Sequence, residues 1–124
     1  MPTPPLVDLP KAFEDARGYI RPLIDEPSGS CQVIYSKKGS IRAAHWHKTD
    51  HHFVYLIEGA MDYLHKPAGS DAAPERVRVS AGQMVFTPAR TWHRMDFVDH
   101  TLMVVLARNP RTQADYEADT VREG

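Results

Sequence analysis

The sequence contains one cysteine, Cys31, and no long hydrophobic run. A single cysteine cannot form an intramolecular disulfide, and it excludes the paired-cysteine patterns of zinc fingers and CxxC redox motifs. The opening stretch M-P-T-P-P-L-V-D-L-P has neither the basic nor the apolar segment of a signal peptide. No run approaches the length of a membrane span. These absences predict a cytoplasmic protein without a membrane partner.

An excess of charge of one sign is also missing. The 124 residues include 15 Lys and Arg against 16 Asp and Glu, which gives a formal net charge of -1. The basic residues are scattered, and this argues against a nucleic acid or an anionic membrane surface as a partner. We therefore expect a small-molecule substrate or ligand.

Helical periodicity is scarce, and the pattern from Ala16 onward is instead one of short β-branched, aromatic and apolar runs between turn residues. We predict strands near 19–24, 32–36, 40–46, 52–58, 60–66, 76–80, 83–87, 92–97 and 101–107. Short strands joined by tight turns predict an antiparallel sandwich or small barrel. A chain of 124 residues fits a single domain.

The two ends of the chain differ from this strand-rich part. Residues 1–12 carry four prolines, and Leu6, Val7 and Leu9 there need to be covered. Near the C-terminus, R-T-Q-A-D-Y-E-A-D-T has a helical signal with Thr112 as the N-cap. We therefore predict an extended arm over residues 1–15, a barrel over 16–108 and a tail over 109–124. The apolar arm and the outward aromatic residues predict a homodimer that exchanges edge strands or arms.

Histidine is the residue with an unusual pattern, because four of the seven histidines fall within eight residues. His45 and His47 are two apart, so both rings leave the same face of a strand. His52 opens the next strand after a polar turn, although His51 competes with it for that position. Further along, G-Q-M-V-F-T-P-A-R-T-W-H predicts a strand, a turn and then His93 at the start of another strand.

With these two stretches the sequence resembles the cupin superfamily, whose motifs are G(X)5HXH(X)3-4E(X)6G and G(X)5PXG(X)2H(X)3N. The matching positions are Gly39, His45, His47, Gly59, Gly82, Pro88 and His93. His52 stands where the family has Glu, Arg90 replaces the middle glycine of the second motif and Phe97 replaces its Asn. The resemblance implies an all-β, single-domain cupin fold, a double-stranded β-helix or jelly-roll barrel with a short C-terminal helical or irregular tail.

Cupins bind one divalent metal ion inside the barrel through these motif positions. The resemblance therefore implies that the metal ligands here are His45, His47, His52 and His93, and the motif spacing favours His52 over His51. Neutral imidazoles suit Zn, Fe, Ni, Cu and, less well, Mn, and four of them leave open positions on an octahedral ion. The alternative is a set of hydrogen-bonded barrel histidines without a metal.

Two side chains on the strand after Gly59 are candidate catalytic residues. Tyr63 and His65 lie two apart and can both face the barrel, with Tyr63 as a possible general acid. The alternatives are a packed tyrosine with its hydroxyl hydrogen-bonded and a structural histidine. Arg42 lies three residues before His45, on the opposite face unless a bulge intervenes, and is interpreted first as a surface or dimer-rim arginine and second as a phosphate binder.

Two further stretches are similar to carbohydrate-active cupins. F-E-D-A-R-G-Y-I and H-W-H-K resemble the D-x-R-G opening of nucleotide-sugar epimerases and ketoisomerases and the H-A-H-K of the ketoisomerases, whose paired histidines move protons without a metal. We predict a metal-dependent cupin enzyme that isomerises or epimerises a carbohydrate or sugar-derived substrate. The alternatives are a dioxygenase using Fe(II) or Mn and a non-catalytic ligand-binding or regulatory module.

Overall fold

The computed structural model describes residues 3–123, which form eleven strands and one helix. The strands are β1 (Phe13–Asp15), β2 (Gly18–Ile20), β3 (Ser30–Ser36), β4 (Ile41–His47), β5 (His52–Glu58), β6 (Ala60–Pro67), β7 (Glu75–Ser80), β8 (Met84–Thr87), β9 (Thr91–Phe97), β10 (Thr101–Ala107) and β11 (Thr120–Arg122). The helix is α1 (Gln113–Asp119). Over residues 3–123, no helix has the length and apolar character needed to cross a membrane.

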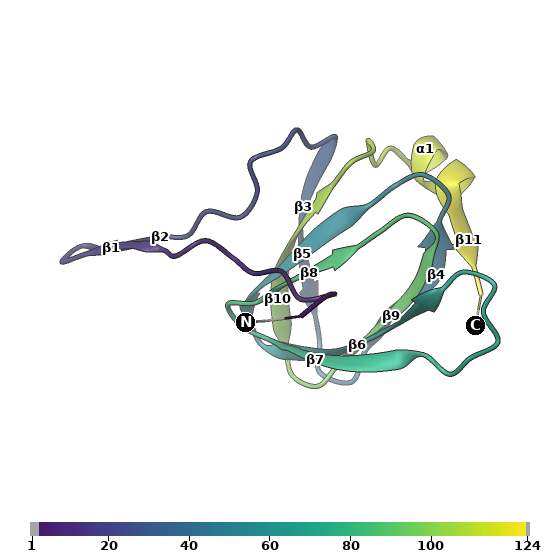
Figure 1. Cartoon of the computed structure of the whole chain (residues 1–124), viewed down its shortest axis with the longest axis horizontal. Coiled ribbons are helices and arrows are strands. Elements are labelled where there is room, and N and C mark those ends of the chain that lie inside the picture. Colours follow the sequence, from purple (N-terminus) through teal and green to yellow (C-terminus); the bar gives the residue numbers. More distant parts are fainter. Residues whose placement is uncertain (1–2, 124) are drawn as a thin grey trace.

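Two antiparallel sheets make up the body of the protein. One has the strand order β3-β10-β5-β8, and the other has the order β11-β4-β9-β6-β7. Neighbouring strands are mostly not consecutive in the chain, which is the connectivity of a jelly roll. Figure 1 shows both sheets curving around a shared interior. The predicted all-β jelly-roll fold is confirmed.

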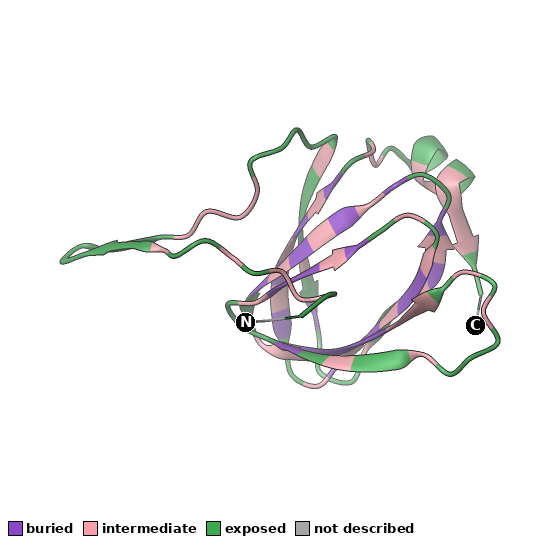
Figure 2. Ribbon diagram, in the orientation of Figure 1, coloured by how far each residue is buried: buried purple, intermediate pink, exposed green. Residues whose placement is uncertain are grey.

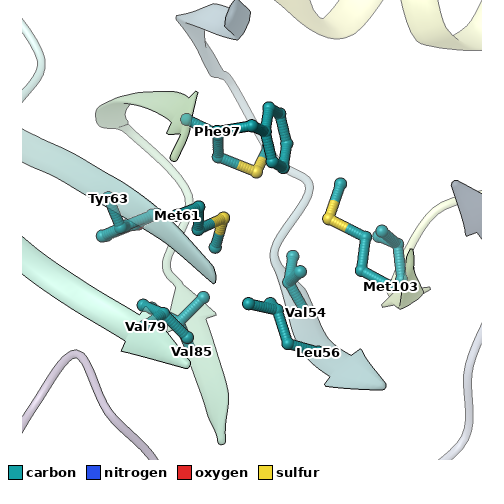
Figure 3. Packing of buried hydrophobic residues seen from close by; sticks show 10 residues of the cluster. Val54, Leu56, Met61, Tyr63, Val79, Val85, Phe97 and Met103 are labelled. Carbon is teal, nitrogen blue, oxygen red and sulfur yellow. The ribbon is translucent and has the colours of Figure 1, made fainter. Parts of the chain in front are cut away.

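The core between the sheets follows from the two-residue period of the strands. Along β10 every second residue is buried, and the same alternation runs through most of β5 and β9. The core consists of Val54, Leu56, Met61, Tyr63, Val79, Val85, Met95, Phe97, Met103 and Val105. Each such apolar side chain contributes about 1.5 to 3 kcal/mol by leaving water. Figure 3 shows these side chains converging from both sheets.

The predicted strands between residues 30 and 107 are found within two residues of their expected ends. The first predicted strand, 19–24, is wrong beyond Ile20, because Pro22 has no backbone N–H to donate to a ladder. Thr112 caps α1 as expected, since its side chain accepts a hydrogen bond from the Asp115 backbone N–H. The sequence pattern did not indicate β1 or β11.

The N-terminal arm lies along the free edge of β8. The Val7 N–H donates to the Met84 carbonyl over 2.9 Å, and the Phe86 N–H donates to the Pro5 carbonyl over 2.9 Å. Leu6 packs against the core as a result. Beyond the arm, β1 and β2 form a hairpin that projects away from the body (Figure 1) and is exposed along almost its whole length (Figure 2).

Candidate functional site

Four buried histidines lie together between the sheets. His45 and His47 are on β4, His52 begins β5 and His93 is on β9. The ring centroids of His45 lie 4.6 Å from His47 and 4.8 Å from His93. The His52 centroid lies 5.0 Å from His93 and 5.9 Å from His47. Residues that are far apart in the chain therefore form one histidine cluster, defined as His45, His47, His52 and His93.

A bulge in β4 sets which side chains face this cluster. Ala43 and Ala44 have positive φ angles of 71° and 58°, and the pairing of β4 with β9 shifts register between Ala43 and His45. The extra residue places Arg42 on the same inward face as His45, opposite the buried Met95. Arg42 is exposed, as its first interpretation as a surface arginine expects, and its side chain also lines the cavity of the cluster.

His93 is oriented by a backbone carbonyl. Its Nδ1 lies 3.0 Å from the Thr91 carbonyl oxygen, which can only accept, so Nδ1 carries the proton of the neutral ring. The lone pair is then on Nε2. That atom is buried and has no hydrogen-bond partner within residues 3–123. Since buried polar atoms nearly always have partners, this nitrogen is available to a ligand.

His47 is oriented in the same way by the C-terminal segment. Its Nδ1 lies 3.2 Å from the Thr120 hydroxyl oxygen, and that hydroxyl donates its own hydrogen to the Tyr116 carbonyl over 2.6 Å. The Thr120 oxygen therefore accepts from His47 Nδ1–H. This leaves the lone pair of His47 on Nε2, which is buried and also lacks a partner among the described residues. The pairing of β11 with β4, Thr120 opposite His47, holds this contact in place (Figure 1).

His52 differs from these two rings. Its Nδ1 lies 3.4 Å from Nη2 of Arg111, and a guanidinium has only donors. The neutral His52 ring therefore carries its proton on Nε2. Within residues 3–123, one group of possible metal ligands has all its ligand atoms within 4.8 Å of one another, and it consists of His45, His47 and His93. His52 as a fourth metal ligand stays a prediction, and between His51 and His52 it is His52 that faces the cluster.

The cluster is neutral at ordinary pH. Burial, followed by the nearby His93 and His47, lowers the pKa of His45 from 6.5 to about 3. Burial is also the main cause that lowers the pKa of His93 to about 4 and the pKa of His47 in the same direction. The pKa of the fully buried His52 lies well below 6.5 for the same reason.

The donor set fits a divalent metal ion. Neutral imidazoles are the usual nitrogen ligands of Zn and Fe, and three of them leave further positions open to substrate or water. Here three such rings lie around one centre, and the Nε2 atoms of two of them have no hydrogen-bond partner within residues 3–123. His45, His47 and His93 are the residues that can hold the ion.

The cluster opens onto a cavity of about 320 Å³, whose wall includes Arg42, Arg111 and Tyr116. The Tyr116 ring lies 5.6 Å from His47 and 6.2 Å from His45. Arg111 and Tyr116 belong to the C-terminal segment and were not among the predicted site residues. The sequence indicates the helix that carries Tyr116, but no motif indicates that this helix folds back over the cluster.

Tyr63 and His65 line a different cavity, of about 740 Å³, between the N-terminal arm and β6. The Tyr63 hydroxyl is hydrogen-bonded to the Thr87 hydroxyl over 2.6 Å, and burial raises the pKa of Tyr63 to about 12. His65 stacks on Tyr63, and its Nε2 lies 3.5 Å from Glu75 Oε2. Their catalytic roles stay a prediction. His51 lines this second cavity too, against Phe86.

The comparisons with known proteins agree with this architecture. A family model described as "Cupin domain" matches residues 32–107. Among curated proteins, none matches the sequence. QdtA, a sugar 3,4-ketoisomerase from Thermoanaerobacterium thermosaccharolyticum solved in complex with TDP, superimposes with a TM-score of 0.76 and 20% identity, covering 95% of this chain and 86% of that chain.

Two further solved structures are similar. WlaRB, a TDP-quinovose 3,4-ketoisomerase from Campylobacter jejuni, has a TM-score of 0.79 and 18% identity over 95% of this chain and 91% of its own. The dTDP-4-dehydrorhamnose 3,5-epimerase from Sulfolobus tokodaii has a TM-score of 0.70 and 14% identity over 86% of this chain and 71% of its own. At such identities the likeness establishes the shared fold.

Proposed function

The chain belongs to the cupin domain family, and on that premise we propose that it is a small-molecule enzyme that isomerises or epimerises a carbohydrate or sugar-derived substrate with the help of a divalent metal ion. The observation that carries the proposal is that the buried Nε2 atoms of His47 and His93 have no hydrogen-bond partner among the residues that the structure describes. Both rings border a cavity that can hold a small molecule. The similar ketoisomerases and epimerase favour a sugar-derived substrate.

The metal ion is assigned to His45, His47 and His93. An ion at this position supplies Lewis-acid chemistry, because it polarises a carbonyl or hydroxyl oxygen. The protein orients the ligand nitrogens through the Thr91 carbonyl and the Thr120 hydroxyl, which fix Nδ1–H on His93 and His47. Burial keeps both rings unprotonated, so their lone pairs remain available.

Proton transfer is assigned to two other side chains. His52 holds a proton on Nε2 because Arg111 faces its Nδ1, so His52 is the ring in the cluster that can give a proton to a substrate oxygen and take it back. Tyr116 lines the same cavity beside His45 and His47 and is assigned as the base, whose phenolate form takes the proton from the neighbouring carbon and returns it as the hydroxyl. Together these steps move a proton between adjacent substrate atoms.

Deuterium exchange tests this function directly. Metal-loaded protein incubated in deuterated water with a panel of keto-sugars is expected to incorporate deuterium at the carbon next to the carbonyl, because isomerisation and epimerisation both break that C–H bond. Mass spectrometry of the recovered sugars measures the incorporation, and His93→Ala protein serves as the control. A metal-loaded protein that exchanges no proton with any member of the panel contradicts the proposal.

A second candidate function is oxygen chemistry with Fe(II) or Mn. The specific observation that favours it is the set of three neutral imidazoles around one centre beside a cavity, which leaves room for O2 and a substrate on the same ion. Substrate-dependent oxygen consumption by Fe(II)-loaded protein separates this function from isomerisation. Tight metal binding with neither proton exchange nor oxygen consumption identifies a non-catalytic ligand-binding module.

We also propose that the protein is a homodimer. The β1–β2 hairpin has strands of three residues, and a hairpin this short is not stable alone in water. It exposes Phe13, Tyr19 and Ile20, each by 66% or more. β3 is the edge strand of its sheet and exposes Val33 and Tyr35. A second copy that lays its hairpin on β3 covers both apolar surfaces and the open edge.

Light scattering is expected to give twice the chain mass for the wild-type protein. Tyr19→Glu is expected to shift the protein to the monomer, because the substitution places a charge within the proposed interface. Arg17→Gln, on the same hairpin and exposed to solvent, is the matched control and keeps the wild-type mass. A wild-type protein that is monomeric at micromolar concentration contradicts the proposed dimer, in which each copy lays its hairpin on the other.

A further inference from the structure

We propose that Arg111 recognises an anionic group of the substrate, a carboxylate or a phosphate, beside the histidine cluster. This deepens the proposed function, since it rests on the same cavity and names the chemical class of the molecule that enters it: a small sugar-derived acid or phosphate ester. The proposal depends on the charges that line the cavity, on the unused donors of Arg111 and on the way in which the C-terminal segment is fixed.

The cavity beside the histidine cluster is lined by cationic and neutral side chains. Its two charged side chains are Arg42 and Arg111, and its other polar groups outside the cluster are Gln32, Gln113 and Tyr116. Within residues 3–123, no aspartate or glutamate lines this cavity. Because the histidines are neutral, the charged groups that line the cavity are both cationic, and Asp50, the carboxylate that pairs with Arg111, does not line it. Such a lining favours an anion.

Arg111 has donors that the protein does not use. Its side chain is only 12% exposed, and Nη2 lies 3.2 Å from Asp50 Oδ2. Its Nε is buried and has no hydrogen-bond partner among the described residues. An unpaired buried donor on a charged group is costly, so a ligand that accepts from this guanidinium gains the bond that the fold leaves open. The flat fork of donors suits carboxylate and phosphate oxygens.

Arg42 cannot take this role in the same way. Its Nε donates to the Ser36 hydroxyl over 2.7 Å, and its Nη2 donates to the Tyr35 carbonyl over 3.1 Å. Two of its three nitrogens are therefore committed to the protein. Arg111 instead uses Nη2 for Asp50 and His52, and it lies over the Tyr116 ring with Cζ 5.1 Å from the ring centroid. Its Nε has no hydrogen-bond partner within residues 3–123.

The segment that carries Arg111 is attached firmly to the barrel although it lies beyond the matched domain, residues 32–107. Asp119 accepts hydrogen bonds from the backbone N–H groups of Thr49 and Asp50 over 2.9 Å and 3.0 Å. Strand β11 pairs with β4 next to the ligand histidines. The C-terminal segment therefore holds the Arg111 guanidinium in a fixed position beside residues of the barrel. A charged side chain that is fixed in this way selects substrates that place the opposite charge beside it.

Calorimetric titration of metal-free protein tests the proposal without any turnover. The probes are malonate as the carboxylate, inorganic phosphate as the phosphate, and malonamide as the neutral analogue of malonate. Chelator is present so that no metal contributes to anion binding. The wild-type protein is expected to bind malonate or phosphate and to show no heat with malonamide, and the better of the two anions identifies which group the substrate carries.

Two arginine variants are compared, Arg111→Gln and Arg42→Gln. Arg111→Gln is expected to weaken anion binding by more than about tenfold, because a charge-assisted pair is lost. Arg42→Gln, which removes the same charge from the same cavity, is expected to stay within about threefold of the wild type. Since Arg111→Gln leaves the buried Asp50 carboxylate without its cationic partner, the double variant Asp50→Asn/Arg111→Gln repeats the measurement with no unpaired charge.

The outcomes separate this proposal from the proposed function. Wild-type protein that binds neither anion overturns the role of Arg111, and so does an Arg111→Gln protein, or a folded double variant, that binds anions as tightly as the wild type. If anion binding depends on Arg111 but no keto-sugar exchanges deuterium, the proposed anion site stands and the proposed isomerase function is wrong. Equal losses in Arg42→Gln and Arg111→Gln indicate a general charge effect and also overturn the proposal.

Discussion

Replacing His93 by alanine is expected to abolish stoichiometric metal binding and to lower turnover by more than about a hundredfold. His93 is fully buried, and its unpartnered Nε2 belongs to the group of nitrogens within 4.8 Å of one another. Without it, two neutral imidazoles remain in that group, and a structural or catalytic site for Zn or Fe uses at least three protein ligands. Elemental analysis of protein purified without added metal, followed by activity measured after reloading, gives both quantities.

The control for this variant is His100→Ala. His100 is exposed on a turn, and its Nδ1 accepts a hydrogen bond from the Lys38 backbone N–H at a distance from the cluster. His100→Ala is expected to keep the metal content and the turnover of the wild type. A His93→Ala protein that is folded, by circular dichroism, and that retains one ion per chain contradicts the assignment of the metal to His45, His47 and His93.

Acidification is expected to remove several kcal/mol from the free energy of unfolding of the metal-free protein. The pKa of His45 is lowered from 6.5 to about 3 in the folded state, and that of His93 to about 4. Between these values and 6.5 the unfolded chain binds protons that the folded chain does not, so the free energy of unfolding rises with pH. The contribution is complete above about pH 6.5 and is lost as the pH falls toward about 4 to 3.

Urea unfolding at several pH values between about 7 and 4, with chelator present, measures this dependence. His45→Asn is the comparison, because asparagine keeps a polar side chain but does not titrate in this range. Its curve of stability against pH is expected to be flatter than that of the wild type. A wild-type free energy of unfolding that stays constant from pH 7 to about 4 contradicts the neutral, desolvated cluster.

The sequence predicts the fold well because strand formation is governed by local patterns. The two-residue alternation along β5, β9 and β10 is visible in the sequence and decides which side chains form the core. The same local rule brings His45 and His47 to one face of β4. The family motif then places His93 beside them, and the structure does bring these three rings together.

The same rule fails where the backbone departs from regular geometry. Arg42 is three residues from His45, and alternation puts the two on opposite faces. The bulge at Ala43 and Ala44 reverses this outcome, and alanine does not mark a left-handed backbone position as glycine does. The direction of Arg42 therefore depends on the pairing of β4 with β9, which is information that a single strand does not contain.

The other site residues that the sequence did not indicate are positioned by contacts between segments that lie far apart in the chain. The helix over Gln113–Asp119 is indicated by its cap at Thr112, but its position over the histidine cluster depends on the pairing of β11 with β4 and on Asp119. Arg111 and Tyr116 reach the site only through these contacts. Tyr63 faces the interior as the alternation predicts, yet it borders the cavity under the N-terminal arm. The domain boundary at residue 108 stays a prediction.

Nitrogen-15 NMR of the imidazole rings, recorded on metal-free protein and again after one equivalent of Zn²⁺, tests the histidine cluster most directly. The expected spectrum shows Nδ1–H and an unprotonated Nε2 for His47 and His93, the opposite tautomer for His52, and a shift of the His45, His47 and His93 signals on addition of Zn²⁺. Protons on Nε2 of His47 and His93, with spectra that do not change when Zn²⁺ is added, contradict a metal site at this cluster.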